Sequence, residues 1–205
     1  MIIGLFSPFC PTTLSDYRTL QTRSRADADS PFQLRLQLQT IPALIAVANV
    51  VSISAPALLP YTLLRLLRVS NGDTGFIFEG APYKDKQLYL KPQLQEALVK
   101  GRANLTRLAR KLVYPTIFTS SCAHKTPTCE SARGTVLAKM YRIDGYLEPL
   151  SHQADLFSPF CAACKQTFGT DMGKGREMVW RELPSAFGLP SWLDLGKMTL
   201  ATNAS

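Results

Sequence analysis

The 205-residue chain lacks most of the patterns by which enzymes are recognised in a sequence. It has only two histidines. Neither occurs in a sequence pattern with a carboxylate residue that suggests a catalytic triad. Gly169, Gly173 and Gly175 lie close together, but no predicted strand precedes them. Neither the G-x-G-x-x-G fingerprint nor a phosphate-binding loop is present. We therefore expect a protein that is not an enzyme.

Long runs of like charge are also missing, although the formal net charge is +8. The positive residues concentrate only modestly, in the Lys84–Lys111 region. No series of base-stacking aromatic residues is interleaved with these charges, so a solvated helix face is favoured over a nucleic-acid site. Nucleic-acid binding through this region is kept as the alternative function, and it predicts retention on DNA or RNA with a steep salt dependence.

The sequence has little that would direct it to the secretory pathway. Its first residues lack a basic region, and their apolar run is broken by Pro8, which makes a poor signal peptide. Five cysteines, four of them in two clusters, are too few for a secreted disulfide scaffold. We expect an intracellular protein of the cytoplasm or nucleus.

One uncharged stretch is long enough to cross a bilayer, between Arg35 and Arg65. It contains Pro42, Pro56 and Pro60 as well as several polar side chains. In lipid these would leave backbone and side-chain groups without hydrogen-bond partners. The stretch therefore predicts two buried helices of a globular core, and no membrane association is expected.

The length is sufficient for one domain with a hydrophobic core. Residues 1–40 show no sustained hydrophobic period and are predicted to be disordered or poorly ordered. Residues 41–197 are predicted to form a single helical domain, and residues 198–205 a disordered tail.

Hydrophobic periodicity predicts mainly helices in the domain. Helices are expected over residues 42–51, 58–69, 92–113, about 130–141 and from Cys161 onwards. The longest has an apolar stripe that steps by four and three along Leu94, Leu98, Gly101, Leu105, Leu108 and Leu112, and Pro115 should stop it.

Only two short pieces are predicted to be extended, Phe76–Phe78 and Gln87–Leu90, with turn residues between them. The predicted fold class is therefore mainly α: an irregular helical domain with one small β-hairpin and a four-cysteine staple.

The cysteines carry the strongest chemical signal. Cys122 and Cys129 are separated by six residues, and Cys161 and Cys164 by two. Two such pairs can supply four thiolates to a tetrahedral structural zinc ion, although the first spacing is looser than usual. Cys10 lies outside this set and is excluded from the site.

Three alternatives to a four-cysteine zinc site stay open. His124 could replace Cys122 or Cys129 as a ligand. The four residues could be free thiols, since cysteine is commonly a small buried apolar residue. Cys161 and Cys164 also have the spacing of a thioredoxin-like redox pair, but no βαβ pattern surrounds them.

The segment Trp180–Trp192 gathers two tryptophans, one phenylalanine and two leucines around two prolines. Aromatic residues dominate interface hot spots, so this segment could dock on a partner. Burial preference favours a segment that folds back on the protein's own core.

Taken in order, these features resemble the C-terminal region of basidiomycete BTB/POZ-domain proteins. The resemblance covers about residues 41–196. It is carried by Ala57-Leu-Leu-Pro-Tyr-Thr-Leu-Leu64, the hairpin from Tyr83 to Leu90, the long helix to Val113, the two cysteine pairs, Trp180-Arg-Glu-Leu-Pro184 and Phe187-Gly-Leu-Pro-Ser-Trp192.

The resemblance implies a fungal intracellular protein whose relatives carry a BTB domain before the helical region. Such proteins often dimerise, and many serve as ubiquitin-ligase adaptors or transcriptional regulators. Residues 1–40 are too short for a BTB fold, so the chain resembles a truncated relative, and only the four cysteines transfer as functional residues. We expect a non-enzymatic protein-interaction module, zinc-stapled through Cys122, Cys129, Cys161 and Cys164, that binds a protein partner.

Overall fold

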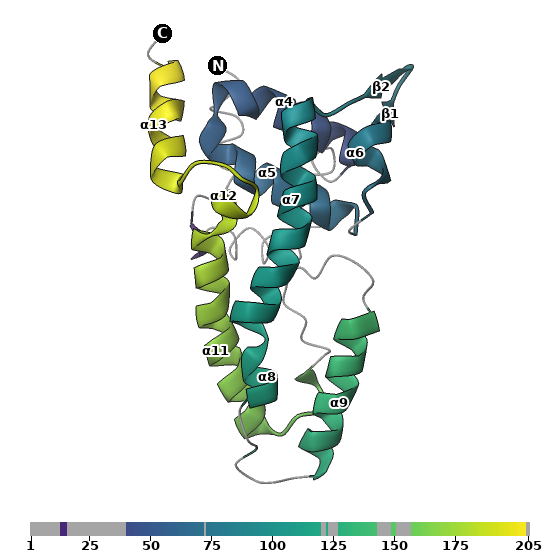
Figure 1. The fold of residues 1–205 in the computed structure, drawn as a ribbon, viewed down its shortest axis with the longest axis vertical. Helices are drawn as coiled ribbons and strands as arrows, with labels where there is room; N and C mark the ends of the chain where they lie inside the picture. The colour runs from purple at the N-terminus through teal and green to yellow at the C-terminus, as the bar shows by residue number, and fades with distance from the viewer. Residues whose placement is uncertain are drawn as a thin grey trace, which may run out of the picture. The chain divides into compact units, whose positions relative to one another are not determined.

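A computed structural model describes residues 13–15, 40–71, 73–119, 122, 127–142, 149–150 and 157–203. The described residues form helices and one two-stranded antiparallel hairpin, which confirms the predicted fold class (Figure 1). The predicted disorder of residues 1–40 falls almost entirely outside the described residues.

The main elements follow one another along the chain with short connections between most of them. They are α4 (Ile41–Ser54), the 3₁₀-helix η2 (Pro56–Leu58), α5 (Leu59–Val69), α6 (Gly75–Glu79), β1 (Ala81–Tyr83), β2 (Lys86–Leu88), α7 (Pro92–Leu108), the π-helix η3 (Ala109–Val113), α8 (Pro115–Thr119), α9 (Pro127–Arg142), α11 (Ala162–Arg181), α12 (Leu183–Ala186) and α13 (Trp192–Asn203).

The predicted single domain of residues 41–197 is divided into two compact units. Unit 1 consists of Met1–Arg102 together with Leu183–Ser205, and unit 2 is Ala103–Glu182. Helix α7 runs across the boundary. A continuous helix gives no sequence signal of a domain boundary, because boundaries are recognised from linkers rich in proline, glycine or polar residues.

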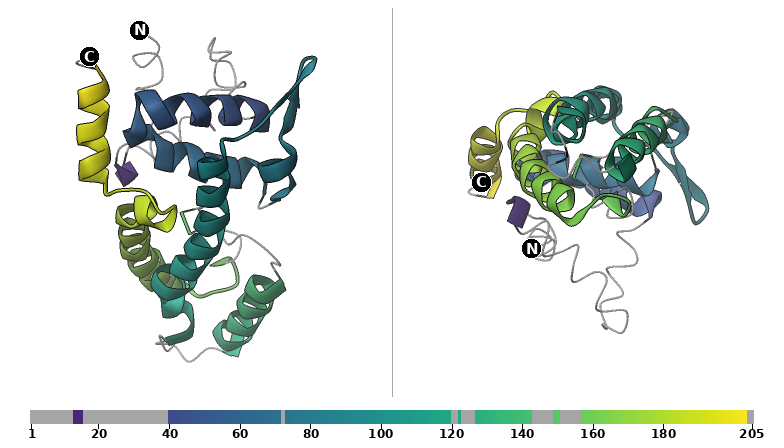
Figure 2. Two further views of the ribbon diagram at one scale, coloured as in Figure 1. Left: turned by 45° about the horizontal axis from the view of Figure 1, so that its top comes forward. Right: turned by 90° about the horizontal axis from the view of Figure 1, so that it is seen from below.

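The core of unit 1 is built on α4 and α5, which pack side by side (Figure 2). On α4 the buried residues are spaced along one face, at Leu44, Ile45, Ala48 and Val51. On α5 they include the predicted Leu59, Leu63, Leu66 and Leu67. Both helices have proline in the first turn, where its missing N–H has no helical partner to lose.

The prediction of an extended Phe76–Phe78 is wrong, since these residues lie in α6. A short apolar run cannot distinguish a buried strand from a buried helical turn by periodicity alone. Here Asp73 Oδ1 accepts a hydrogen bond from the Gly75 N–H at 2.9 Å, which supports a helical turn from Gly75. Gly80 ends the turn with a φ of 73°, a conformation that favours glycine.

The hairpin itself is confirmed, but it begins five residues later than predicted. Ala81 pairs with Leu88 and Tyr83 with Lys86. The turn between the strands includes Lys84, which has a φ of 52°.

Asn49 of α4 ties the end of the hairpin to the core of unit 1. Its side-chain Nδ2 donates to the Tyr89 carbonyl at 2.8 Å, and its Oδ1 accepts from the Lys91 N–H at 3.1 Å. The Lys91 ammonium in turn donates to the Asn49 carbonyl at 3.0 Å. One side chain thus satisfies two backbone groups that lie outside the hairpin ladder.

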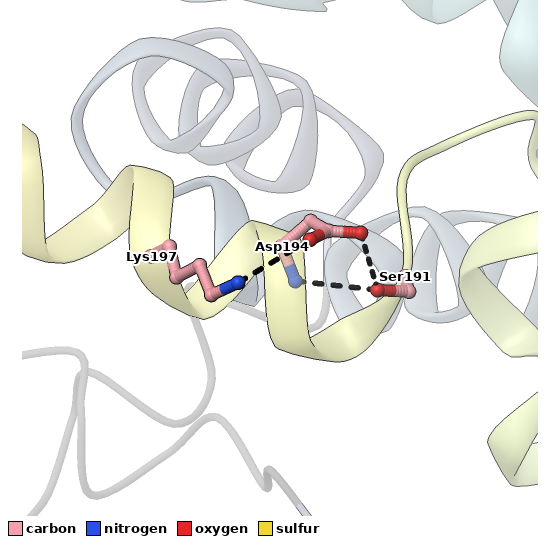
Figure 3. Close-up of polar contacts among 3 residues, drawn as sticks. All are labelled: Ser191, Asp194 and Lys197. Carbon is pink, nitrogen blue, oxygen red and sulfur yellow. Dashed lines mark hydrogen bonds and ion pairs between the residues drawn. The ribbon is translucent and has the colours of Figure 1, made fainter.

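Helix α13 continues to Asn203, so most of the predicted disordered tail at 198–205 is helical. Its start is capped by Ser191, whose Oγ accepts from the Asp194 N–H at 3.2 Å and donates to Asp194 Oδ2 at 2.6 Å (Figure 3). Ser191 therefore acts as a side-chain N-cap of α13, and the Asp194 carboxylate accepts from its hydroxyl. Thr199 Oγ1 accepts from the Ala57 N–H at 3.1 Å, which joins α13 to η2 within unit 1.

In unit 2, α11 packs against η3 and α8. The predicted leucine stripe is correct from Leu94 to Leu105, but Leu108 and Leu112 are only half-buried. Ala109 and Val113 are buried instead, because the π-helical turn adds a residue and moves the inward face by one position. The Tyr114 N–H donates to the Ala109 carbonyl at 3.1 Å, which is a π-type bond. Pro115, predicted as a helix stop, is also the first residue of α8.

The aromatic residues of the Trp180–Trp192 segment divide between the two units. Trp180 is buried in unit 2, and Phe187 is buried in unit 1, where its ring lies against Gly101. Both therefore serve as core residues, as burial preference indicated. No helix among the described residues is both long enough and apolar enough to span a bilayer.

Candidate metal centre

The four clustered cysteines all belong to unit 2. Three of them lie at the starts of two helices, and the fourth lies outside any helix. Cys129 lies in the first turn of α9, and Cys122 precedes that helix. Cys161 is the N-cap residue of α11, and Cys164 lies in its first turn. The sequence correctly predicted that Cys161 lies at the start of a helix. Helix α9 was predicted to begin at about residue 130, but it begins at Pro127 and therefore includes Cys129.

The structure brings the four sulfur atoms into one cluster. All four Sγ atoms lie within 4.8 Å of one another. The Sγ atoms of Cys122 and Cys161 are 3.9 Å apart, and no disulfide joins any of the four. A tetrahedral site with zinc–sulfur bonds of about 2.3 Å requires sulfur–sulfur distances of about 3.8 Å. The cluster could therefore hold a metal ion with little rearrangement.

Burial makes this cluster different from cysteines scattered on a surface. Cys122, Cys129 and Cys164 are buried, and Cys161 is half-buried. Structural metal sites are closed to solvent in this way, whereas catalytic sites keep an open coordination position.

A backbone N–H group donates a hydrogen bond to one of the four sulfur atoms. The Cys161 N–H donates to Cys129 Sγ at 3.3 Å, which links the start of α11 to the start of α9. A donor aimed at sulfur stabilises the thiolate relative to the thiol, as does the positive end of a helix. Both effects favour the charged form that binds a metal ion.

In the metal-free protein, burial outweighs these effects at Cys164. Burial, followed by hydrogen bonds with the neighbouring Cys122, Cys161 and Cys129, raises the pKa of Cys164 to about 12. A thiol with so high a pKa is protonated near neutral pH and is itself a poor nucleophile. A metal ion would have to displace this proton, so metal binding would be weakened by acid.

Aromatic side chains pack beside the second cysteine pair. The rings of Phe160 and Phe168 meet edge to face, with centroids 5.0 Å apart, and Phe157 lies 6.1 Å from Phe168. Phe160 precedes Cys161, and Phe168 follows Cys164 by one helical turn. The hydrophobic pattern predicted Phe168 on this helix but gave no link between the aromatic cluster and the cysteine site. The closeness of Phe160 and Phe168 to Cys161 and Cys164 in the sequence is the signal that could have revealed this link.

Three residues weighed in the sequence lie outside the described residues. They are His124, which was the alternative ligand, Cys10, which was excluded from the site, and His152, the other histidine.

The basic Lys84–Lys111 region uses part of its charge within the protein. In unit 1, Lys91 donates to the Asn49 carbonyl, as described above, and Lys100 forms an ion pair with Glu96 at 2.6 Å. The hydrogen bond from Lys100, and then its charge, hold the pKa of the Glu96 carboxyl below its usual value. These contacts support the interpretation of the region as a solvated helix face.

Comparison with known proteins identifies no relative: no family model, no curated protein and no solved structure matches this chain.

Proposed function

We propose that this chain is a non-enzymatic protein-interaction module whose unit 2 is held together by a structural zinc ion. The observation that carries the proposal is the buried group of four sulfur atoms within 4.8 Å of one another. Four thiolates select zinc, or an iron–sulfur cluster, over the hard cations that prefer oxygen ligands. Among these, a single tetrahedral zinc ion fits the 3.9 Å sulfur separation.

Zinc would contribute to folding rather than to chemistry here. The four ligands come from two short parts of the chain, Cys122 to Cys129 and Cys161 to Cys164. A bound ion would tie the start of α9 to the start of α11. All four coordination positions would be filled by sulfur, which leaves no position for a substrate or an activated water.

The metal content of the full-length purified protein tests this proposal. We expect one zinc ion per chain by elemental analysis, and a lower melting temperature after treatment with a strong chelator. Re-addition of zinc should restore the melting temperature, whereas magnesium should not, because thiolates bind hard cations poorly. Protein that contains no metal and melts at the same temperature with and without chelator would contradict the proposal.

The interaction role is supported by exposed aromatic residues around α6 and the hairpin of unit 1. Phe78 is 64%, Tyr83 50% and Tyr89 54% exposed. Exposed aromatic groups are costly to leave in water and are enriched at interface hot spots. The family resemblance, which rests on the motifs quoted above, points the same way, since BTB proteins act by binding other proteins.

A triple substitution of Phe78, Tyr83 and Tyr89 by serine tests the interaction role. We expect unchanged zinc content and unchanged helix content, because these side chains are exposed, together with loss of at least one partner in quantitative cross-linking from cells. A triple substitution of the exposed Lys86, Lys100 and Lys111 by glutamine provides the matched control. Equal partner recovery by wild type and the aromatic variant would contradict the assignment. Selective loss from the lysine variant would favour the nucleic-acid alternative.

A further inference from the structure

Arg133 of α9 is half-buried, and part of its guanidinium group is fully buried. The Nε and Nη2 atoms of Arg133 are buried and have no hydrogen-bond partner among the residues that the structure describes. Guanidinium nitrogens carry positive charge and strong donors, and leaving such groups buried and unsatisfied is energetically unfavourable. Such an arginine would be stabilised by a negatively charged partner in its vicinity.

The position of Arg133 on α9 identifies the candidate partner. Cys129, Ala132 and Val136 are buried at 0%, 4% and 2% exposure, and they define the inward face of the helix. Arg133 follows Cys129 by four residues, so the two side chains lie on the same face, with Cβ atoms about 5–6 Å apart. Helical side chains also lean toward the N-terminus, which brings that of Arg133 toward the turn containing Cys129.

The negative charge of the metal-bound cysteine cluster would provide the partner that the Arg133 guanidinium lacks among the described residues. A divalent ion bound by four thiolates has a net charge of about −2. That charge would be largely buried, because three of the four ligands are buried and the fourth is half-buried. Buried charge is tolerated when a partner of opposite sign and hydrogen bonds compensate it.

We propose that Arg133 is a positioning residue of the metal centre, donating N–H groups to the Cys129 thiolate when the metal is bound. This inference rests on the proposed zinc site. Cys129 Sγ already accepts one backbone hydrogen bond, from the Cys161 N–H at the start of α11. Arg133 adds a charged donor from α9 itself and offsets part of the negative charge.

Zinc affinity of the full-length chain, measured by competition with a chromogenic chelator, tests the role of Arg133. We expect Arg133→Met to bind zinc 10–100-fold more weakly than wild type, roughly the range found when outer-shell partners of metal ligands are removed. Arg133→Lys, which keeps the charge, should recover part of this loss. The matched control is Arg110→Met, which removes an exposed arginine of η3 in the same unit and should leave the affinity unchanged.

Two further measurements separate this role from simple packing. In the metal-free state, Arg133→Met should be as stable as wild type or more stable, because it removes buried donors that have no partner among the described residues. With Co²⁺ in place of zinc, the sulfur-to-cobalt charge-transfer band of Arg133→Met should move to lower energy, because the sulfur lone pairs lose a hydrogen-bond donor. The band of Arg110→Met should not move.

The possible failures are distinguishable. If wild type binds neither zinc nor cobalt, the proposed function fails. If wild type binds zinc but Arg133→Met binds it with the same affinity and an unchanged cobalt band, only the role of Arg133 is overturned. Loss of stability in metal-free Arg133→Met would assign the residue to packing and would also overturn the inference.

Discussion

A Cys164→Ser variant is expected to purify without zinc and with unit 2 strongly destabilised. Cys164 is buried at the start of α11, and its Sγ lies within 4.8 Å of the other three sulfurs. A serine hydroxyl does not replace a thiolate as a zinc ligand. Structural zinc contributes about 10–16 kcal/mol of apparent binding free energy in zinc-finger peptides, and this energy is coupled to folding. Losing even part of this energy is a large effect, because the whole stability of a typical domain is about 5–15 kcal/mol.

Elemental analysis measures the loss of zinc, and hydrogen–deuterium exchange measures the loss of stability in each helix. Amide protection should fall first in α9 and α11, whose starts the metal would join, and α4 and α5 of unit 1 should retain more protection. Cys10→Ser is the matched control, because Cys10 is not a proposed ligand. A Cys164→Ser protein with wild-type melting temperature and wild-type protection in α11 would show that the cluster consists of thiols without a structural metal.

The second large effect is expected at Gly175, in the middle of α11. A Cβ at this position would run into the Leu112 backbone, close to its carbonyl oxygen, 2.8 Å from its carbonyl carbon and 3.0 Å from Val113 Cα. Backbone cannot rotate away as a side chain can, so Gly175→Ala must push α11 from η3. We expect a loss of about 1–3 kcal/mol or more in the free energy of unfolding, the range for overpacked cores.

Gly173, two residues earlier on the same helix, provides the matched control. A Cβ there would have no neighbour within 4 Å. Gly173→Ala should therefore stabilise the protein by about 0.5–1 kcal/mol, because alanine loses less backbone entropy than glycine in a helix. Urea unfolding of both variants at equal metal loading measures the difference. Equal stability of the two variants would show that α11 does not approach η3 as closely as the structure places it.

The sequence was sufficient to predict those features that depend on local pattern. The helix of α5 follows from its leucine spacing, and the entrance of α11 at Cys161 was predicted from the residues around it. The grouping of the four cysteines followed from the ligand rules for zinc, which require two pairs to converge. Convergence of residues 32 positions apart, such as Cys129 and Cys161, is what the structure adds.

The features that the sequence could not supply depend on tertiary context. The π-helical turn shifts burial from Leu108 to Ala109, although leucine is the larger apolar side chain. The helical turn at Phe76–Phe78 is flanked by the hydrogen bond at Asp73 and by the positive φ at Gly80, neither of which the apolar run itself reveals. Arg133 could not be recognised as a site residue, because its importance lies in two buried nitrogen atoms that have no partner among the described residues.

The division of unit 1 into two pieces of chain has a consequence for synthesis. Unit 2 is complete at Glu182, whereas α12 and α13, which belong to unit 1, come only after it. Chains emerge from the ribosome at about 5–20 residues per second, and domains generally fold as units once they are available. The inserted unit can therefore fold, and could bind a metal ion, before Thr199 has been made. Only afterwards can Thr199 Oγ1 accept the hydrogen bond from the Ala57 N–H, so the unit that begins first is completed last.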